Sequence, residues 1–414
     1  MERKIIMTKH QLKIERLISE LCPNGVEFKE LGELGEFYGG LSGKSKKDFT
    51  DGNAKFVTYM NIFSNIAINT DIKDFVKVGI DENQNKIEFG DVLFTGSSET
   101  PNECGMSSVL IKKVSDPLYL NSFCFGFRLH NKDLFLPEFL KYLFRDEQLR
   151  KQITKTASGV TRFNVSKKRF AKIIIPIPPL AVQEEIVKIL NSFTELEAEL
   201  EAELEARKKQ YEYYYKKLLK VNEDVNQMTL NEIGKISMCK RIFKNETLAT
   251  GDIPFYKIGT FGKQPNAFIS QKIYDEYRKK FSFPKKGDIL LSASGTIGRR
   301  VIYNGEPAYF QDSNIIWIDN DESKILNKFL YYVYATVEWK TEGGTIQRLY
   351  NDNIKKIKIP APTLDEQKKI ITTLDKFDAL VNDISIGLPA ELKARRQQYE
   401  YYRGKLLTFK EYVK

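Results

Sequence analysis

The chain contains few of the residues on which acid–base and metal chemistry depends. Its 414 residues include two histidines and four cysteines. Neither His10 nor His130 lies in a recognisable catalytic motif, and no cysteines or histidines have zinc-ligand spacing. Motifs such as H-E-x-x-H, G-x-S-x-G and G-x-G-x-x-G after a strand are also missing. We therefore expect reduced thiols, no metal, no cofactor and no catalytic residue.

Long hydrophobic runs are missing as well. No stretch of about 18 apolar residues occurs, and the opening MERKIIMTKHQLKIERLISEL is too charged for a secretory signal. These absences predict a cytoplasmic protein without a membrane segment.

Basic residues are in excess. Lysine and arginine number 65 against 55 aspartates and glutamates, which gives a formal net charge of +10. This balance favours an anionic partner such as nucleic acid, although a basic enzyme is the plainer alternative.

The strongest pattern is an internal duplication. IPIPPLAVQEEIVKIL at 175–190 matches IPAPTLDEQKKIITTL at 359–374, and RKKQYEYYYKKLL at 207–219 matches RRQQYEYYRGKLL at 395–407. Weaker similarities precede each block. KIEFGDVLF resembles PKKGDILL, and TASGVTRF at 156–163 resembles EGGTIQRL at 342–349, which aligns Arg162 with Arg348. Two copies predict a pseudo-dimer within one polypeptide.

Each conserved block predicts a long helix opened by prolines, because apolar residues then recur at alternating spacings of three and four. These apolar residues form a stripe, or seam, along each helix. The two seams should pack on one another, so that the helices run antiparallel and form a coiled-coil spacer. A helix of about 40 residues spans about 60 Å. The first helix should be continuous, and the second should break near Gly387–Pro389. The representative seam and subunit-docking residues are Ile186, Phe193, Leu200, Tyr211, Leu218, Ile370, Phe377, Ile384, Tyr399 and Leu406.

The segments between the conserved blocks are rich in short β-type runs bounded by Gly, Asn, Asp and Ser. They predict two α/β or α+β domains of similar topology. The expected boundaries are 1–21 for a helical extension, 22–178 and 222–362 for the two globular domains, and 179–221 and 363–414 for the long helices.

One loop, GGLSGKS at 39–45, resembles a phosphate-binding loop. The pattern requires a glycine where Tyr38 stands, and no buried apolar strand precedes it. A basic loop of this kind fits a nucleic-acid backbone better than a nucleotide.

Other Gly/Ser loops occur at matching positions of the two copies, as expected of duplicated reading surfaces. Arginine can pair with guanine and glutamine with adenine, while hydroxyls and lysines hold phosphates. For each loop, an ordinary surface turn is the alternative. The candidate DNA contacts are Ser42, Lys44, Lys46, Lys47, Ser97, Ser98, Thr161, Arg162, Lys240, Arg241, Ser292, Ser294, Thr296, Arg299, Arg300, Gln347 and Arg348.

Over essentially its whole length, the chain resembles the specificity subunit of type I restriction–modification enzymes. The similarity rests on CPNGVEFKELGELGEFYGG, the paired GD-[IV]-L strands, the paired I-P-x-P-x-L-x-x-Q openings and the paired Q-Y-E-Y-Y ends. It implies two target-recognition domains, each reading one half of a split site in double-stranded DNA. It also implies helices that set the gap and dock two modification subunits, which methylate adenine, and restriction subunits that translocate and cut DNA.

Two other functions remain as alternatives. The chain could be a non-enzymatic coiled-coil scaffold that binds proteins, or a nucleotide-dependent enzyme that uses the GGLSGKS loop.

Overall fold

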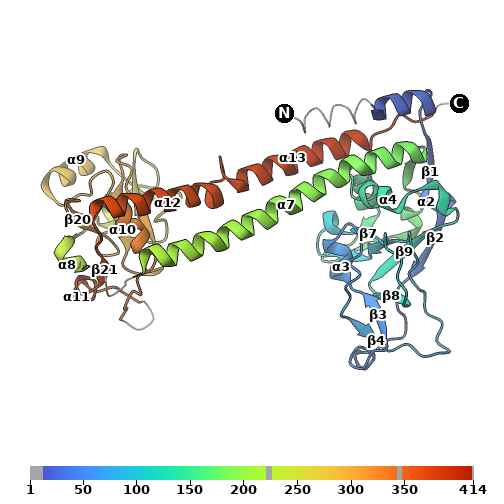
Figure 1. The fold of residues 1–414 in the computed structure, drawn as a ribbon, viewed down its shortest axis with the longest axis horizontal. Coiled ribbons are helices and arrows are strands. Elements are labelled where there is room, and N and C mark those ends of the chain that lie inside the picture. Colours follow the sequence, from blue (N-terminus) through green and yellow to red (C-terminus); the bar gives the residue numbers. More distant parts are fainter. Residues whose placement is uncertain (1–12, 221–225, 343–346, 413–414) are drawn as a thin grey trace. The chain divides into compact units, whose positions relative to one another are not determined.

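The computed structural model describes residues 13–220, 226–342 and 347–412. Its contacts divide the chain into unit 1, residues 1–201 and 392–414, and unit 2, residues 202–391. Both units combine helices with short strands, as predicted (Figure 1).

The elements of unit 1 follow a helical segment at 13–21. Its strands are β1 (Glu27–Glu30), β2 (Gly35–Gly39), β3 (Ala54–Val57), β4 (Phe75–Val76), β5 (Val92–Thr95), β6 (Ser97–Ser98), β7 (Ser107–Val109), β8 (Leu118–Leu120), β9 (Cys124–Leu129), β10 (Ala157–Ser158), β11 (Phe163–Val165) and β12 (Ile174–Ile177). Its short helices are α2 (Leu31–Leu34), α3 (Tyr59–Ser64), α4 (Pro137–Leu143), α5 (Glu147–Lys155) and α6 (Lys167–Phe170).

Unit 2 repeats much of this order. Its strands are β13 (Gln227–Thr229), β14 (Gly234–Ser237), β15 (Ile253–Tyr256), β16 (Phe268–Ile269), β17 (Ile289–Ser292), β18 (Arg300–Ile302), β19 (Tyr309–Phe310), β20 (Ile315–Asn320) and β21 (Lys358–Pro360). Its short helices are α8 (Leu230–Ile233), α9 (Gln271–Lys280), α10 (Asn327–Val333) and α11 (Asn351–Lys355).

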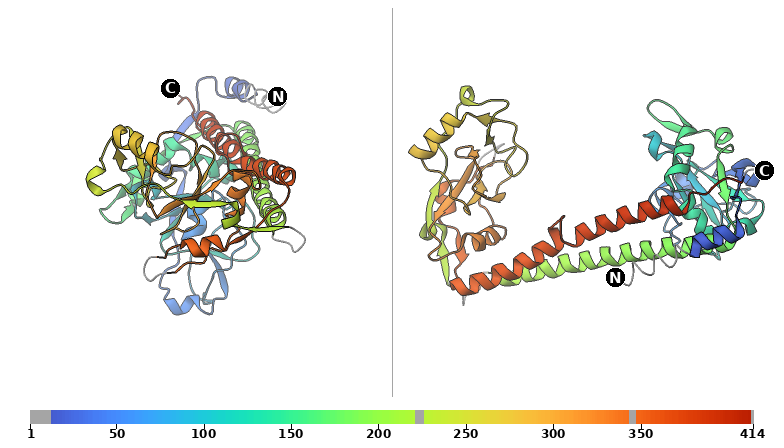
Figure 2. Two further views of the ribbon diagram at one scale, coloured as in Figure 1. Left: turned by 90° about the vertical axis from the view of Figure 1, so that its left-hand side faces the viewer. Right: turned by 90° about the horizontal axis from the view of Figure 1, so that it is seen from above.

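Two sheets and one strand pair of unit 1 recur with the same strand order in unit 2, and unit 1 has a further sheet, β10-β11-β6. The strand order β2-β9-β5-β7 in unit 1 corresponds to β14-β20-β17-β18 in unit 2. A second sheet has one antiparallel and one parallel pairing in both units, with order β4-β3-β8 and β16-β15-β19. The pair β1-β12 corresponds to β13-β21. Two further directions of view are given in Figure 2. The prediction of two α/β domains of similar topology is therefore confirmed.

The repeated Gly-Asp sequence before β5 and β17 forms the same turn twice. Gly90 and Gly287 have φ values of +88° and +95°, which glycine adopts without strain. The next residue, Asp91 or Asp288, is buried, and its carboxylate accepts the backbone N–H three residues before it at 2.8 Å or 2.7 Å. The turn requires both the glycine conformation and the aspartate hydrogen bond, which explains why the Gly-Asp motif occurs in both copies.

The long helices are α7 (Leu180–Leu219), α12 (Leu364–Asn382) and α13 (Leu388–Leu406). Helix α7 is continuous over its 40 residues, whereas the second helical region is interrupted between Asn382 and Leu388. The Gly387 N–H donates to the Asp383 carbonyl at 3.0 Å and closes the turn that follows α12. A Cβ at Gly387 would lie 2.4 Å from the Ala379 carbonyl oxygen, so glycine is required there.

In unit 1, the first half of α7 packs against α13. The Phe193 ring lies 5.6 Å from the Tyr402 ring and 6.2 Å from the Tyr399 ring. Arg396 pairs with Glu197 and Glu201, both at 2.5 Å. Contacts made by higher-numbered residues of α7 involve lower-numbered residues of α13, so the two helical segments are antiparallel.

In unit 2, the second half of α7 packs against α12. The Phe377 ring stacks between Tyr211 and Tyr214, with centroids 5.9 Å and 5.5 Å away. Long helices in contact were predicted, and both units contain such a pair.

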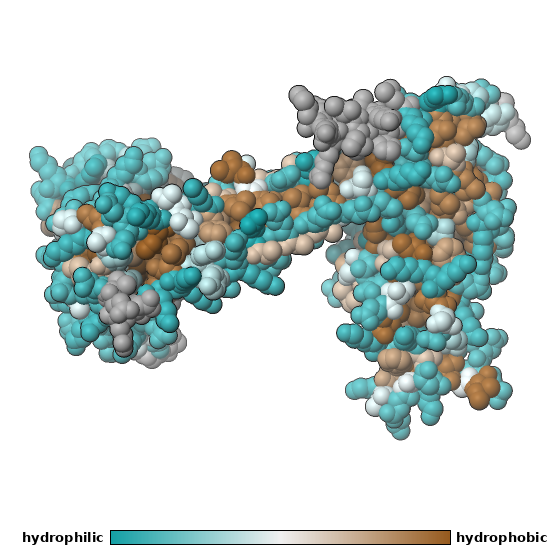
Figure 3. Space-filling view, viewed as in Figure 1, coloured by the Kyte–Doolittle hydropathy of each residue, from teal (hydrophilic) through white to brown (hydrophobic). Residues whose placement is uncertain are grey.

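The predicted seam residues differ in burial. Ile186, Phe193, Leu200 and Leu406 are buried, and most of the others are half-buried. Ile384 was predicted to lie in the seam, but it is 81% exposed, because α12 ends before it. The protruding hydrophobic turn between α12 and α13 is visible in Figure 3.

The hydrophobic cores join the sheets to the long helices. The main core of unit 1 includes Phe94, Phe127 and Phe170 together with Ile186 of α7 and Leu407 after α13. The main core of unit 2 joins α10 and the four-stranded sheet to Leu219 of α7 and Leu374 of α12. All four cysteines are buried and free, and burial raises the pKa of the Cys124 and Cys239 thiols to about 12.

The ends of unit 1 are tied together by backbone hydrogen bonds. The Val26 N–H donates to Lys410 at 2.9 Å, and the Tyr412 N–H donates to Val26 at 2.8 Å. Lys13, in the first helical segment, pairs at 2.7 Å with Glu185, which is 1% exposed. Among the residues described, no helix is long and apolar enough to span a membrane.

Candidate nucleic-acid interface

In unit 1, a buried serine after β5 joins two loops that are distant in sequence. Ser97, in β6, is 6% exposed, and its Oγ accepts hydrogen bonds from Arg162 Nε and Nη2 at 3.1 and 2.9 Å. The same guanidinium lies 5.6 Å from the centre of the Phe123 ring. The structure therefore brings the candidates Ser97 and Arg162 together, beside exposed Thr161 and half-buried Ser98.

The corresponding loop of unit 2 follows β17. Ser294 is 4% exposed, and its Oγ donates to Asn314 Oδ1 at 2.6 Å. Ser292, also buried, accepts the Arg299 N–H at 2.8 Å and donates to the Thr296 carbonyl at 2.5 Å. These bonds fold the SASGTIGRR segment into a fixed loop.

Both arginines of that loop already have intramolecular contacts. Arg299 Nη1 donates to the Phe261 carbonyl at 2.8 Å. The Arg300 guanidinium lies 4.7 Å from the centre of the Tyr331 ring, and its Nε is buried without a hydrogen bond among the described residues. Arg300 therefore acts first as a packing residue between β18 and α10.

The segments TASGVTRF and EGGTIQRL are equivalent in the structure, but their correct alignment differs by two residues from the one made by sequence. The alignment matched Arg162 with Arg348. In the structure, Asn164 pairs with Ser97, and Arg348 makes the equivalent bridge to Ser294. The counterpart of Arg348 is thus Asn164. Residues 343–346 of the GGTIQR segment lie outside the described residues, whereas Gln347 and Arg348 are exposed.

The GGLSGKS loop does not have a phosphate-binding arrangement. Lys44 Nζ donates to Glu82 at 2.5 Å and to the Lys77 carbonyl at 2.6 Å, and its side chain is 8% exposed. Hydrogen bonding from Lys44 lowers the pKa of the Glu82 carboxyl to about 2. The loop leads into a short 3₁₀ turn, Lys46–Phe49, rather than an α-helix. Lys44 therefore fixes this loop.

The remaining candidates lie on loop surfaces. Ser42, Lys46 and Lys47 are exposed in unit 1. In unit 2, Lys240 lies 5.2 Å from the Phe281 ring centre, and Arg241 pairs with Asp312 at 2.8 Å. Lys46, Lys47 and Lys240 suit phosphate contact, because exposed lysines attract the backbone without reading sequence.

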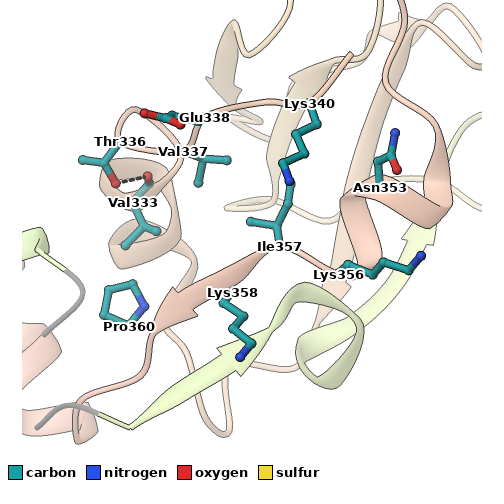
Figure 4. Close-up of a pocket in the computed structure, with 10 residues that line it drawn as sticks. All are labelled: Val333, Thr336, Val337, Glu338, Lys340, Asn353, Lys356, Ile357, Lys358 and Pro360. Carbon is teal, nitrogen blue, oxygen red and sulfur yellow. Dashed lines mark hydrogen bonds between the residues drawn. The ribbon is translucent and has the colours of Figure 1, made fainter. Parts of the chain in front are cut away.

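A second basic surface in unit 2 was not predicted. The residues that line an open pocket of about 540 Å³ include Lys340, Lys356, Lys358 and Glu338 (Figure 4). Val333, Ile357 and Pro360 form its apolar part. Three lysines against one glutamate give the lining a net positive charge, which favours an anionic partner.

Sequence analysis also missed residues beside the two serines. Phe123 and Asn314, in corresponding turns, and Asn164, on β11, were not candidates. Phe123 is 61% exposed. No motif marks such positions, and only the hydrogen bonding of the folded chain relates them.

Two sheet-based units of one topology, each with exposed lysines on its loops and a pair of packed long helices, fit the class of duplicated DNA-binding subunits. The sequence profile of the type I restriction modification DNA specificity domain matches residues 23–206 and 222–394. The chain belongs to this family. As a specificity subunit, it is a non-catalytic member of a restriction–modification system.

Relatives in two bacteria agree with this family. A protein of Haemophilus influenzae named as a type I restriction enzyme specificity subunit is 56% identical over 261 residues, covering 61% of this chain and 68% of the relative. A type I restriction enzyme specificity subunit of Escherichia coli is 35% identical over 257 residues, covering 58% of this chain and 63% of the relative.

Solved structures share the fold. The HsdS subunit of Thermoanaerobacter tengcongensis has a TM-score of 0.53 at 17% identity, covering 93% of this chain and 96% of that chain. A chain from a structural study of complex assembly and conformational transition in the type I system has a TM-score of 0.60 at 18% identity, covering 92% and 97%.

Proposed function

We propose that each unit reads one half of a split, asymmetric site in double-stranded DNA. Residues 22–178 and 222–362 are the two reading domains, and 179–221 and 363–414 are the helices that set the unread gap. Residues 1–21 are an N-terminal extension, of which the described part, 13–21, is helical. The observation that carries this proposal is the repeated sheet order, which presents matched loops with different side chains in the two units.

The same proposal assigns the chain's partners. The long helices dock two modification subunits that methylate adenine, and restriction subunits join that assembly in the cytoplasm. The relative of known fold whose study concerns complex assembly supports this assignment. Exposed seam and turn residues, including Ile384 at 81% exposure, offer hydrophobic contact area for such partners.

A domain exchange tests the proposal. Residues 22–178 are replaced by the equivalent segment of a relative, and methylated adenines are mapped in DNA exposed to the assembled complex. One half of the recognised site should change while the other half is retained. Change in both halves, or in neither, would contradict the assignment of one domain to each half.

The scaffold alternative makes a different prediction. A protein-binding scaffold would leave the assembled complex without measurable preference for any duplex sequence. Competition between specific and random duplexes at a fixed salt concentration separates the two functions, because non-specific DNA binding depends on salt.

A further inference from the structure

A turn beside the buried serine occupies the same position in both units. In unit 1, the Gly96 N–H donates to the Phe123 carbonyl at 2.8 Å. In unit 2, the Ala293 N–H donates to the Asn314 carbonyl at 2.7 Å. Gly96 and Ala293 each precede a buried serine, so Phe123 and Asn314 are structural equivalents.

A second pair of equivalent positions lies on the facing strand. The Val165 N–H donates to Gly96 at 2.9 Å, and the Leu349 N–H donates to Ala293 at 2.8 Å. The preceding residues, Asn164 and Arg348, are therefore equivalent, in agreement with their pairing to Ser97 and Ser294.

The buried position is constant and the exposed positions vary. Ser97 and Ser294 are the same residue, 6% and 4% exposed. Phe123 is 61% exposed and Asn164 is exposed, whereas unit 2 presents half-buried Asn314 and exposed Arg348. Two domains that read different base sequences require this combination of a shared buried residue and different exposed side chains.

The Phe123 turn is held by contacts within the chain. The Phe123 N–H donates to Asn121 Oδ1 at 2.9 Å. A Cβ on Gly96 would lie 2.6 Å from the Phe123 carbonyl oxygen, so a side chain at this position would force the Phe123 turn to shift. The Arg162 guanidinium, held on Ser97, lies 5.6 Å from the ring centre. A preorganised phenyl ring next to a cation loses little side-chain entropy when it contacts a ligand.

Resting on the proposed function, we propose that these paired positions determine specificity in both half-sites. In unit 1, Phe123 packs against a thymine methyl group and Asn164 pairs with adenine. In unit 2, Arg348 binds guanine and Asn314 assists it by hydrogen bonding. These side chains match the groups that bases present in the major groove. The first half-site then contains an A·T pair at this contact, and the second contains a G·C pair.

Single substitutions in the assembled complex test the assignment. Methylation rates are measured on a set of duplexes in which each base pair of both half-sites is changed in turn. Phe123→Ala should reduce discrimination at one A·T pair of the first half-site by roughly fivefold, since a methyl contact is lost. Arg348→Ala should reduce discrimination at one G·C pair of the second half-site by roughly 5- to 150-fold.

Matched controls separate contact from general surface change. Ile80→Ala removes an apolar side chain in unit 1 that is 104% exposed, and Lys279→Ala removes an exposed cation in unit 2. Both should keep wild-type discrimination, and the thermal unfolding of all four variants should match wild type. Wild-type discrimination by Phe123→Ala and Arg348→Ala, or loss spread over both half-sites, overturns the inference. A wild-type complex without any sequence preference would instead overturn the proposed function.

Discussion

Gln183 and Gln367 make the same three hydrogen bonds in their respective units. In unit 1, the Gln183 Oε1 accepts the Leu136 N–H at 2.9 Å. Its Nε2 donates to the carbonyl oxygens of Leu134 and Pro178 at 2.9 Å and 2.7 Å. The glutamine thereby joins the start of α7 to the loop before α4.

The second copy repeats each bond. Gln367 Oε1 accepts the Leu326 N–H at 2.8 Å. Its Nε2 donates to the carbonyl oxygens of Lys324 and Pro362 at 2.8 Å and 2.9 Å. Both glutamines are 0% exposed, so the invariant glutamine of the duplicated motif has a structural role.

Alanine at either glutamine should destabilise one unit. Gln183→Ala leaves buried backbone groups without partners and should lower the free energy of unfolding of unit 1 by about 2–4 kcal/mol. Gln367→Ala should do the same in unit 2. Because both tryptophans, Trp317 and Trp339, lie in unit 2, tryptophan fluorescence should shift for Gln367→Ala, while circular dichroism detects both transitions.

Glu184→Ala is the control for this pair, because its side chain is exposed one residue from Gln183. It should change the free energy of unfolding by less than about 0.5 kcal/mol. Equal denaturation midpoints for Gln183→Ala and Glu184→Ala would contradict the role assigned to the buried amide.

The Lys44–Glu82 pair makes the loop at 39–49 sensitive to acid. The folded pKa of Glu82, about 2, is below its ordinary value of 4.5, so the pair stabilises the loop above pH 4.5 and this contribution is lost as pH falls toward 2. In Lys44→Ala the pKa of Glu82 should rise, yet stay below 4.5, because Gly79 and Gln84 still donate to it. A carboxyl NMR titration measures the shift.

Lys47→Ala provides the comparison, because this lysine is exposed in the same loop. The Glu82 pKa should be unchanged in it. An unchanged Glu82 pKa in Lys44→Ala would show that the salt bridge does not form in solution. Retained DNA discrimination in Lys44→Ala would further exclude a role for the loop in phosphate chemistry.

The duplication made much of the fold predictable. The repeated GD-[IV]-L motif forms the turn closed by the buried aspartate, and the repeated I-P-x-P-x-L-x-x-Q motif supplies the buried glutamine. Because both motifs have a local structural role, they identify equivalent positions in two divergent domains. The continuity of the first helix was predictable because no glycine or proline occurs between residues 180 and 219. The interruption of the second helical region coincides with Gly387, whose close carbonyl contacts exclude a side chain.

The candidate site was less predictable, because base-reading positions depend on pairing between distant segments. Arg162 and Arg348 align by sequence, but backbone hydrogen bonds shift the match to Asn164. Lys44 and Arg300 carry the right charge for DNA, yet Glu82 and Tyr331 already engage them. Phe123 carries no motif at all.

The contact between α7 and α13 should depend on its aromatic pairs more than on its ion pairs. Phe193→Ala removes a buried ring packed on Tyr399 and Tyr402 and should lower the free energy of unfolding of unit 1 by about 3–5 kcal/mol. Arg396→Ala removes exposed pairs and should lower it by less than about 1 kcal/mol. Denaturant titration of both variants gives the comparison. A larger loss in Arg396→Ala would mean that charge pairing dominates this contact.

The length of α7 should set the spacing of the recognised site. Residues 197–206 repeat a Glu-Ala-Glu-Leu pattern, so deletion of Glu201–Leu204 preserves the sequence on either side. Four residues shorten a helix by about 6 Å and turn it by about 40° beyond one full turn, which nearly retains the buried face. Since duplex DNA rises about 3.4 Å per base pair, the unread gap should shrink by one or two base pairs.

Mapping methylated adenines gives the gap directly, because each half-site is located by its own modified base. Inserting a further Glu-Ala-Glu-Leu unit at the same place should lengthen the gap by the same one or two base pairs. The pair of variants separates helix length from general damage, since damage cannot change the gap in opposite directions. Full-rate methylation with an unaltered gap in both variants would show that the helix does not determine the spacing.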